Sequence, residues 1–128
     1  MAERAWTVSA IDHVQLAMPA DSEAEAVAFY EGVLGIPEVT KPEPMASRGG
    51  CWFEAGGLKV HLGIDPEFNP ATKAHPALIV LGIRALVTSL EAAGVAARWD
   101  DELPGWDRAF IADPFGNRIE LMEPRPSL

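Results

Sequence analysis

A strictly alternating heptapeptide near the middle of the chain is the strongest constraint on the fold. In LKVHLGI, residues 58–64, every second side chain is apolar, and His61 lies at the centre of the other set. A period of two is typical of a β-strand that packs one face against a core. The sequence therefore predicts that His61 lies on a strand and points away from the packed face.

A second apolar run follows after a short loop. Residues 66–74 contain two prolines and no apolar periodicity, and residues 75–81 then alternate from His75 to Leu81. Such a run, bounded by a proline-containing loop, again predicts a strand. We therefore expect His61 and His75 to lie on two different strands.

The segment before residue 58 predicts the order strand, helix and three strands. Residues 11–18 alternate and predict an opening strand that carries His13. A capping box that begins at Ser22 and a glycine C-cap at Gly35 predict a helix over residues 22–34. The next elements are predicted as an edge strand or irregular loop over residues 36–44, a short strand over 51–54 and a tight turn at Gly56-Gly57.

The second half of the chain repeats this order. Its predicted elements are a strand over residues 75–81, a helix over 83–93, a weak strand over 95–99, a strand near 108–112, a turn over 113–117 and a last strand over 118–123. The chain is thus predicted to be an α+β protein made of two β-α-β-β-β modules, residues 11–65 and 75–123, within one domain over residues 8–124.

Residues capable of binding a metal fall at matching places in the two modules. His13 and His75 lie in the opening strands. His61 follows Gly57 by four residues (61 − 57), and Glu120 follows Gly116 by four residues (120 − 116). If a pseudo-twofold axis relates the modules, the four side chains converge on one site. The residues concerned are His13, His61, His75 and Glu120.

Composition excludes several classes of partner. The 128 residues carry a net charge of −9 with only 10 Lys and Arg, which argues against binding to nucleic acid or to an anionic membrane. The single cysteine, Cys51, cannot form an intramolecular disulfide, and the first ten residues lack the apolar core of a signal peptide. We therefore expect a cytoplasmic protein that binds a small molecule.

Several segments resemble the vicinal oxygen chelate superfamily, which includes glyoxalases, bleomycin-resistance proteins and extradiol dioxygenases. The resemblance extends over about residues 11–123 and is carried by IDHVQLAM followed by AVAFYEGVLG, by KAHPALIVL and by DPFGNRIELMEP. It implies a fold of paired modules whose sheets curl around a metal. It also implies that His13, His61, His75 and Glu120 hold that metal, because the family places its ligands on the first and last strands of the modules.

Three imidazoles and one carboxylate would form a site suited to Zn, Ni, Co or Fe(II) rather than to Mg or Ca. With four protein ligands, the metal would act as a Lewis acid in an isomerase or lyase, and we expect Glu120 and His61 to be the catalytic residues. Without His61, the remaining residues form the two-histidine, one-carboxylate triad of Fe(II) oxygenases.

Three functions therefore stay open at the level of sequence. A glyoxalase-like isomerase or lyase is favoured, although glyoxalase I-like members have a carboxylate where this chain has His61. The alternatives are an extradiol-type dioxygenase and a metal-free protein that binds a drug. Because each module alone has an open concave face, we also expect a homodimer.

Overall fold

The computed structural model describes residues 3–126 and contains two modules of the same order. The first comprises β1 (Val14–Met18), α1 (Glu23–Val27), η1 (Ala28–Val33), β2 (Glu38–Val39), η2 (Met45–Arg48), β3 (Cys51–Ala55) and β4 (Leu58–Ile64). The second comprises β5 (Ala77–Ile79), α2 (Ile83–Ala92), β6 (Arg98–Asp100), β7 (Trp106–Ala112) and β8 (Arg118–Pro124). The predicted pair of β-α-β-β-β modules is therefore confirmed.

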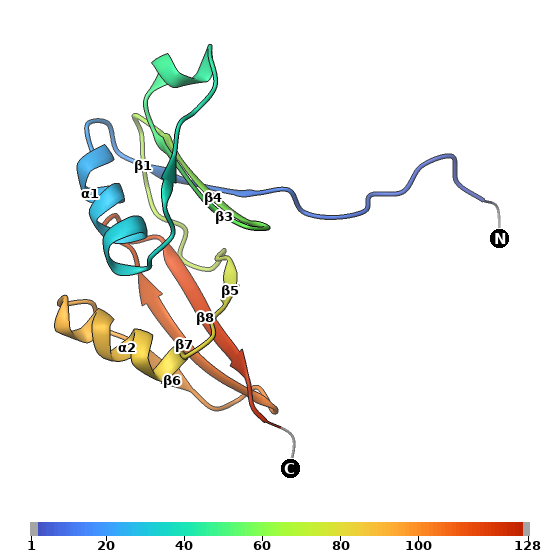
Figure 1. Ribbon diagram of the computed structural model, residues 1–128, viewed down its shortest axis with the longest axis vertical. Coiled ribbons are helices and arrows are strands. Elements are labelled where there is room, and N and C mark those ends of the chain that lie inside the picture. The colour runs from blue at the N-terminus through green and yellow to red at the C-terminus, as the bar shows by residue number, and fades with distance from the viewer. Residues whose placement is uncertain (1–2, 127–128) are drawn as a thin grey trace.

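Each module forms its own four-stranded sheet. The strand orders are β1-β4-β3-β2 and β5-β8-β7-β6, and in each sheet the first and last strands of the module are parallel neighbours. The helices lie along one side of the sheets, and the segment before β1 extends away from the body (Figure 1). Within residues 3–126, no helix has the length and apolar character needed to cross a membrane.

The core lies between the sheets and their helices. Alternation along β4 buries Val60 and Leu62 on this side, and the same period buries Ile119 and Leu121 of β8. The other core residues are Met18, Ala26, Phe29, Tyr30, Ile36, Cys51, Phe53, Ile83, Val87, Leu90, Ala109 and Ile111. Among residues 3–126, no helix covers the opposite face of either sheet (Figure 1), and we call these surfaces the open faces.

Both opening strands begin later than the alternation predicts. β1 begins at Val14 and β5 at Ala77, so His13 and His75 precede their strands, and the prediction that they lie on strands is wrong. For His75 the physical reason is Pro76, which has no N–H to donate to a ladder. The Pro76 carbonyl still accepts a hydrogen bond from the Glu120 N–H at 2.9 Å, which ties His75 to β8.

The first helix also differs from the prediction. It changes after five residues into the wider π-helical turn η1, in which the Leu34 N–H reaches back five residues to the Phe29 carbonyl. The predicted capping box does not form, because the Ser22 hydroxyl bonds the Ala20 carbonyl at 3.3 Å rather than a helix N–H. The wide turn places Phe29 and Tyr30 in the core.

A buried carboxylate joins the two modules. Asp113, in the turn before β8, is 5% exposed and accepts a 2.6 Å hydrogen bond from the Tyr30 hydroxyl of η1. The Asn117 side chain donates to Asp113 and to the Ala17 carbonyl of β1, both at 2.8 Å. Because burial raises the pKa of Tyr30, its hydroxyl stays a donor. We call Tyr30, Asp113 and Asn117 the module link.

Removing one donor from the module link should destabilise the chain. We expect Tyr30→Phe to lower the free energy of unfolding by about 1.5–3 kcal/mol, the range for a hydrogen bond to a charged group. Urea titration followed by circular dichroism measures this change. In the control Thr88→Val, which removes an exposed bond to the Arg84 carbonyl, the change should stay within about 0.5 kcal/mol. Equal stabilities of Tyr30→Phe and the wild type would contradict the role of the link.

Candidate functional site

His61 lies within a column of stacked rings on the open face of the first sheet. In the ladder it is opposite Gln15 of β1 and Trp52 of β3. Its ring lies 4.1 Å from that of Trp52 with an angle of 4° between the planes, and 4.4 Å from that of His13. These neighbours leave His61 only 4% exposed although it points away from the core, as predicted.

The His61 ring is also held by a carboxylate. Nε2 of His61 lies 2.8 Å from Oε2 of Glu54, which is on β3 two residues after Trp52. His13 makes a similar but more exposed contact, with its Nδ1 3.0 Å from Oδ2 of Asp12. A carboxylate on one ring nitrogen fixes the orientation and tautomer of an imidazole. The His61 ring is therefore held in place, and its other nitrogen, Nδ1, remains for a metal ion or a proton.

His75 and Glu120 form a second pair on the second sheet. Nε2 of His75 lies 2.9 Å from Oε1 of Glu120, which is only 6% exposed. Nδ1 of His75 lies 2.9 Å from the Lys73 carbonyl oxygen, which can only accept a hydrogen bond. Nδ1 therefore carries a proton, and Nε2 faces a carboxylate. Because two lone pairs would otherwise oppose each other, one of the two atoms, Nε2 or Oε1, carries a proton in this hydrogen bond.

The other oxygen of Glu120 is held by an arginine. Nη1 of Arg108 on β7 lies 3.3 Å from Oε2 of Glu120, and its Nη2 lies 2.8 Å from Oδ1 of Asp100 on β6. The hydrogen bond from Arg108 is the main reason why the pKa of Asp100 is lowered. Glu120 is therefore fixed on both sides, by a ring nitrogen and by a guanidinium group.

The two pairs occupy equivalent places in their sheets. Gln15 pairs with His61 in the first ladder, and Ala77 pairs with Glu120 in the second. His13 precedes Gln15 by two residues (15 − 13), and His75 precedes Ala77 by two (77 − 75). The matching registers predicted from the sequence are therefore present in the structure.

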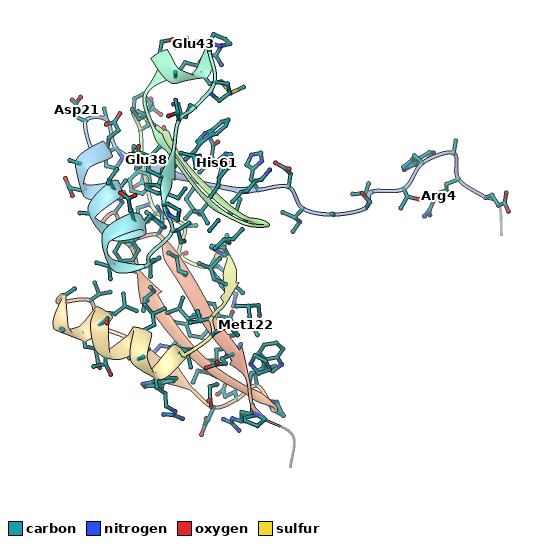
Figure 2. All side chains as sticks on the ribbon, viewed as in Figure 1. Arg4, Asp21, Glu38, Glu43, His61 and Met122 are labelled. Atoms are coloured by element: carbon teal, nitrogen blue, oxygen red, sulfur yellow. The ribbon has the colours of Figure 1, made fainter. Side chains whose placement is uncertain are left out.

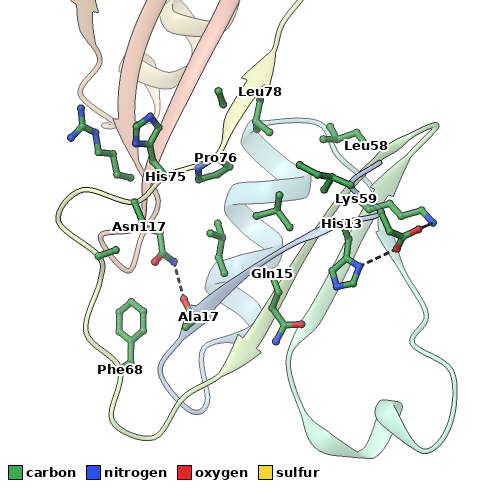
Figure 3. A pocket seen from close by; sticks show the side chains of 18 of the residues that line it. His13, Gln15, Ala17, Leu58, Lys59, Phe68, His75, Pro76, Leu78 and Asn117 are labelled. Atoms are coloured by element: carbon green, nitrogen blue, oxygen red, sulfur yellow. Dashed lines mark hydrogen bonds and ion pairs between the residues drawn. The ribbon is translucent and has the colours of Figure 1, made fainter. Parts of the chain in front are cut away.

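A cleft of about 780 Å³ opens between the opening strands of the two sheets. Figure 3 shows His13 on one side of it and His75 on the other, with the bond between Asn117 and Ala17 between them. Figure 2 shows His61 among the side chains of the first sheet, whereas Met122, on the strand of Glu120, lies in the second. Within residues 3–126 of one chain, no three His, Cys, Asp or Glu side chains are grouped as metal ligands. One chain thus brings the four predicted ligands together only in two pairs, His13 with His61 and His75 with Glu120, and we call these pairs the half-sites.

Two contacts of the half-sites are absent from the sequence predictions, those of Glu54 and Arg108. A signal for Glu54 was present, because a two-residue turn at Gly56-Gly57 fixes the pairing of β3 with β4 and places Glu54 on the face of His61. Arg108 had no such signal, since the loop between β7 and β8 does not by itself fix their register.

Comparison with known proteins identifies the fold family. Residues 10–121 match the Glyoxalase/Bleomycin resistance protein/Dioxygenase superfamily. Among curated proteins, no significant match is found. Among solved structures, a protein from Bacillus anthracis assigned to the glyoxalase family is 44% identical, with a TM-score of 0.90 over 96% of this chain and 100% of that one.

More distant structures share the fold. The fosfomycin resistance protein FosX from Listeria monocytogenes is 15% identical, with a TM-score of 0.74 over 93% of this chain and 96% of that one. The antibiotic-binding protein TnmS3 from a Streptomyces species is 23% identical, with a TM-score of 0.69 over 91% of this chain and 99% of that one. The superfamily match and the 44% identical structure decide the assignment, and the chain belongs to the Glyoxalase/Bleomycin resistance protein/Dioxygenase superfamily.

Proposed function

We propose that this chain is a metal-dependent enzyme that moves a proton on a small oxygenated substrate, as an isomerase or a lyase. The observation that carries the proposal is the environment of His75, whose Nδ1 donates to the Lys73 carbonyl while Nε2 faces Glu120. Histidines that bind metals commonly donate their other N–H to a carbonyl in this way. A divalent cation beside Nε2 would satisfy both that nitrogen and the carboxylate.

The donor set fits such a cation. Nε2 of His75 and Oε1 of Glu120 are 2.9 Å apart. A metal ion that took both atoms as ligands at the usual distances of about 2.0–2.2 Å would hold them about 3 Å apart or a little more, so the pair would need only a small adjustment to bind it. Imidazole and carboxylate donors suit Zn, Ni, Co or Fe(II). When bound, the metal would act as a Lewis acid that polarises a substrate carbonyl.

We propose that a second copy of the chain completes the site. Each copy would bring His13 and His61 against the partner's equivalent of His75 and Glu120. Two features support this arrangement: the open faces have no helix over them, and the segment before β1 exposes large apolar residues. Trp6, Val8 and Ile11 are 67%, 89% and 81% exposed, respectively. An extended apolar arm of this kind is suited to packing on a partner.

In the proposed reaction, Glu120 and His61 handle the proton. Arg108 holds Oε2 of Glu120, so the oxygen that would accept and return the proton is Oε1, which also faces His75 and the proposed metal. Glu54 and Trp52 hold His61 so that its other ring nitrogen, Nδ1, can accept a proton from the substrate. The near-complete burial of Glu120 and His61 keeps water from competing for the proton.

A second candidate is an Fe(II) dioxygenase of the extradiol type. The contact between His61 and Glu54 at 2.8 Å favours it, because a histidine already held by a carboxylate can remain outside the metal sphere. His13, His75 and Glu120 would then form the two-histidine, one-carboxylate triad.

A third candidate is a metal-free protein that binds a drug. The cleft of about 780 Å³ has the size of a small-molecule pocket, and its lining includes the aromatic rings of His13, Phe68 and His75, which could contact an aromatic ligand. One relative, TnmS3, is described as an antibiotic-binding protein. Absence of metal binding by the wild type would favour this function over both enzymes.

The first prediction of the proposal concerns metal affinity. His75→Ala and Glu120→Ala should each weaken binding of Zn or Ni by more than the roughly 10-fold to 100-fold typical of residues that only support the ligands. Isothermal titration of metal into protein purified without a chelating tag measures the affinity. Glu91→Ala, which removes a carboxylate from the exposed side of α2, is the matched control. Unchanged affinity in both ligand variants would refute the metal site.

A second prediction separates the two enzymes through His61. If it binds the metal, His61→Gln should weaken metal affinity about 10-fold or more. If it only transfers a proton, affinity should stay close to wild type while turnover falls by about 10²–10⁴. Retained affinity, together with oxygen uptake by the Fe(II) form in the presence of a catechol, would replace the isomerase proposal by the dioxygenase.

A third prediction tests whether two chains share the site. His13→Ala and His75→Ala should each bind metal poorly when alone. In a mixed dimer of the two variants, one site contains both substitutions and the other contains neither. Randomly mixed dimers should therefore recover about a quarter of the wild-type metal content, since half of them are heterodimers with one intact site. If the site lies within one chain, mixing recovers none.

A further inference from the structure

Three arginines surround one aromatic ring on the open face of the second sheet. The guanidinium carbons of Arg98, Arg108 and Arg118 lie 4.8, 5.2 and 4.5 Å from the centre of the Phe110 ring. They come from the adjacent strands β6, β7 and β8. We call these four residues the arginine cluster. In a chain with only 10 Lys and Arg and a net charge of −9, this local gathering of cations requires an explanation.

The carboxylates near the arginine cluster do not neutralise it. Asp100 and Glu120 both bind Arg108. Arg98 has only a 3.8 Å contact with Asp100, and its side chain is 63% exposed. Across residues 3–126, no carboxylate lies within ion-pair distance of Arg118. Arg98 and Arg118 therefore keep most of their charge available for a ligand.

Phe110 positions the cluster next to the second half-site. In the ladder, Phe110 lies opposite Arg98 on one side and opposite Glu120 on the other. Its ring also meets the His75 ring edge-on at 5.6 Å. Arg118 itself lines the cleft that contains His75. A group bound between Arg98 and Arg118 would thus lie beside the residues proposed to handle the proton.

A guanidinium group stacked on a ring is prepared for anions. The ring attracts the face of the guanidinium group, so the N–H groups around its edge remain free for hydrogen bonds. Two N–H groups of one arginine match the two oxygens of a carboxylate, phosphate or phosphonate. Phe110 therefore acts as a platform that restricts Arg98 and Arg118 in advance, which lowers the entropy cost of binding an anion.

We infer that Arg98 and Arg118, held over Phe110, form an anion-binding subsite, and that the substrate carries a carboxylate, phosphate or phosphonate group. Arg108 has a separate role, because its contacts with Asp100 and Glu120 position Glu120. That this anion belongs to the substrate rests on the proposed function. Binding of the anion itself requires only the second sheet and no metal.

The test titrates metal-free protein with inorganic phosphate and, separately, with acetate at low salt, by isothermal titration calorimetry. We expect Arg118→Gln and Arg98→Gln each to weaken binding of the preferred anion about 10-fold or more, the effect of losing one charge-assisted hydrogen bond. Arg118→Lys should restore only part of the affinity, because lysine keeps the charge but loses the paired N–H groups. The tighter of the two anions indicates which group the substrate carries.

Arg84→Gln is the matched control. Arg84 also lies over an aromatic ring, 5.3 Å from the centre of Trp99, but it is not part of the arginine cluster. Its loss changes the net charge by the same amount and should leave anion affinity within about twofold of wild type. Equal weakening by Arg84→Gln and Arg118→Gln would overturn the subsite, because it would reduce the effect to overall charge. Anion affinity equal to wild type in both Arg98→Gln and Arg118→Gln would also overturn the subsite.

Two further measurements separate this inference from the proposed function. Metal-free His75→Ala should retain phosphate or acetate binding while it loses metal binding, and its circular dichroism spectrum should match that of wild type. If the wild type binds no metal but binds the anion through Arg118, the metal-dependent function fails and the subsite stands. If it binds metal but the arginine variants bind the anion like wild type, the subsite fails and the function stands.

Discussion

One buried carboxylate, that of Asp113, ties the two modules together beneath their shared core. Asp113 accepts hydrogen bonds from the Tyr30 hydroxyl, from the Asn117 side chain and from the backbone N–H groups of Phe115 and Asn117. A carboxylate this deeply buried is tolerable only when donors replace the lost water. Since these donors come from η1 and from the turn before β8, satisfying the charge also fixes one sheet relative to the other. The cleft between β1 and β5, with His13 and His75 on its sides, follows from that fixed relation.

Much of the fold could be predicted from short-range patterns. Alternation located β4 at residues 58–64 as observed, and the glycine after α2 located the end of that helix to within one residue. The equivalent registers of His61 and Glu120 could be predicted because each follows a glycine turn by the same number of residues. Such features depend on neighbours in the sequence, which a single chain displays directly.

The predictions that failed concern features that depend on residues far apart in the sequence. The capping box at Ser22 did not form, and a π-helical turn replaced regular helix where Tyr30 reaches the core and Asp113. The contact between Arg108 and Glu120 requires the register of β7 with β8, which the loop between them does not specify. The assignment of His13, His61, His75 and Glu120 to one metal stays a prediction, because one chain brings them together only in pairs. The sequence therefore predicts the registers of the four residues within their sheets, but it does not predict which open faces come into contact.

The uneven distribution of charge limits how two such chains could associate. The open face of the second sheet carries Arg98, Arg108 and Arg118, whereas that of the first carries the ring column of Trp52, His61 and His13. Contact between two second sheets would bring Arg98 and Arg118 of one chain against the same two arginines of the other, and like charges brought together at an interface cost several kcal/mol. Electrostatics therefore disfavours that pairing, and the proposed contact between the first sheet of one chain and the second sheet of the other avoids it. In a dimer with a twofold axis, both contacts between a first and a second sheet are equivalent, and both avoid the repulsion between arginines. The arginines would then favour one symmetry of the dimer as well as one class of ligand.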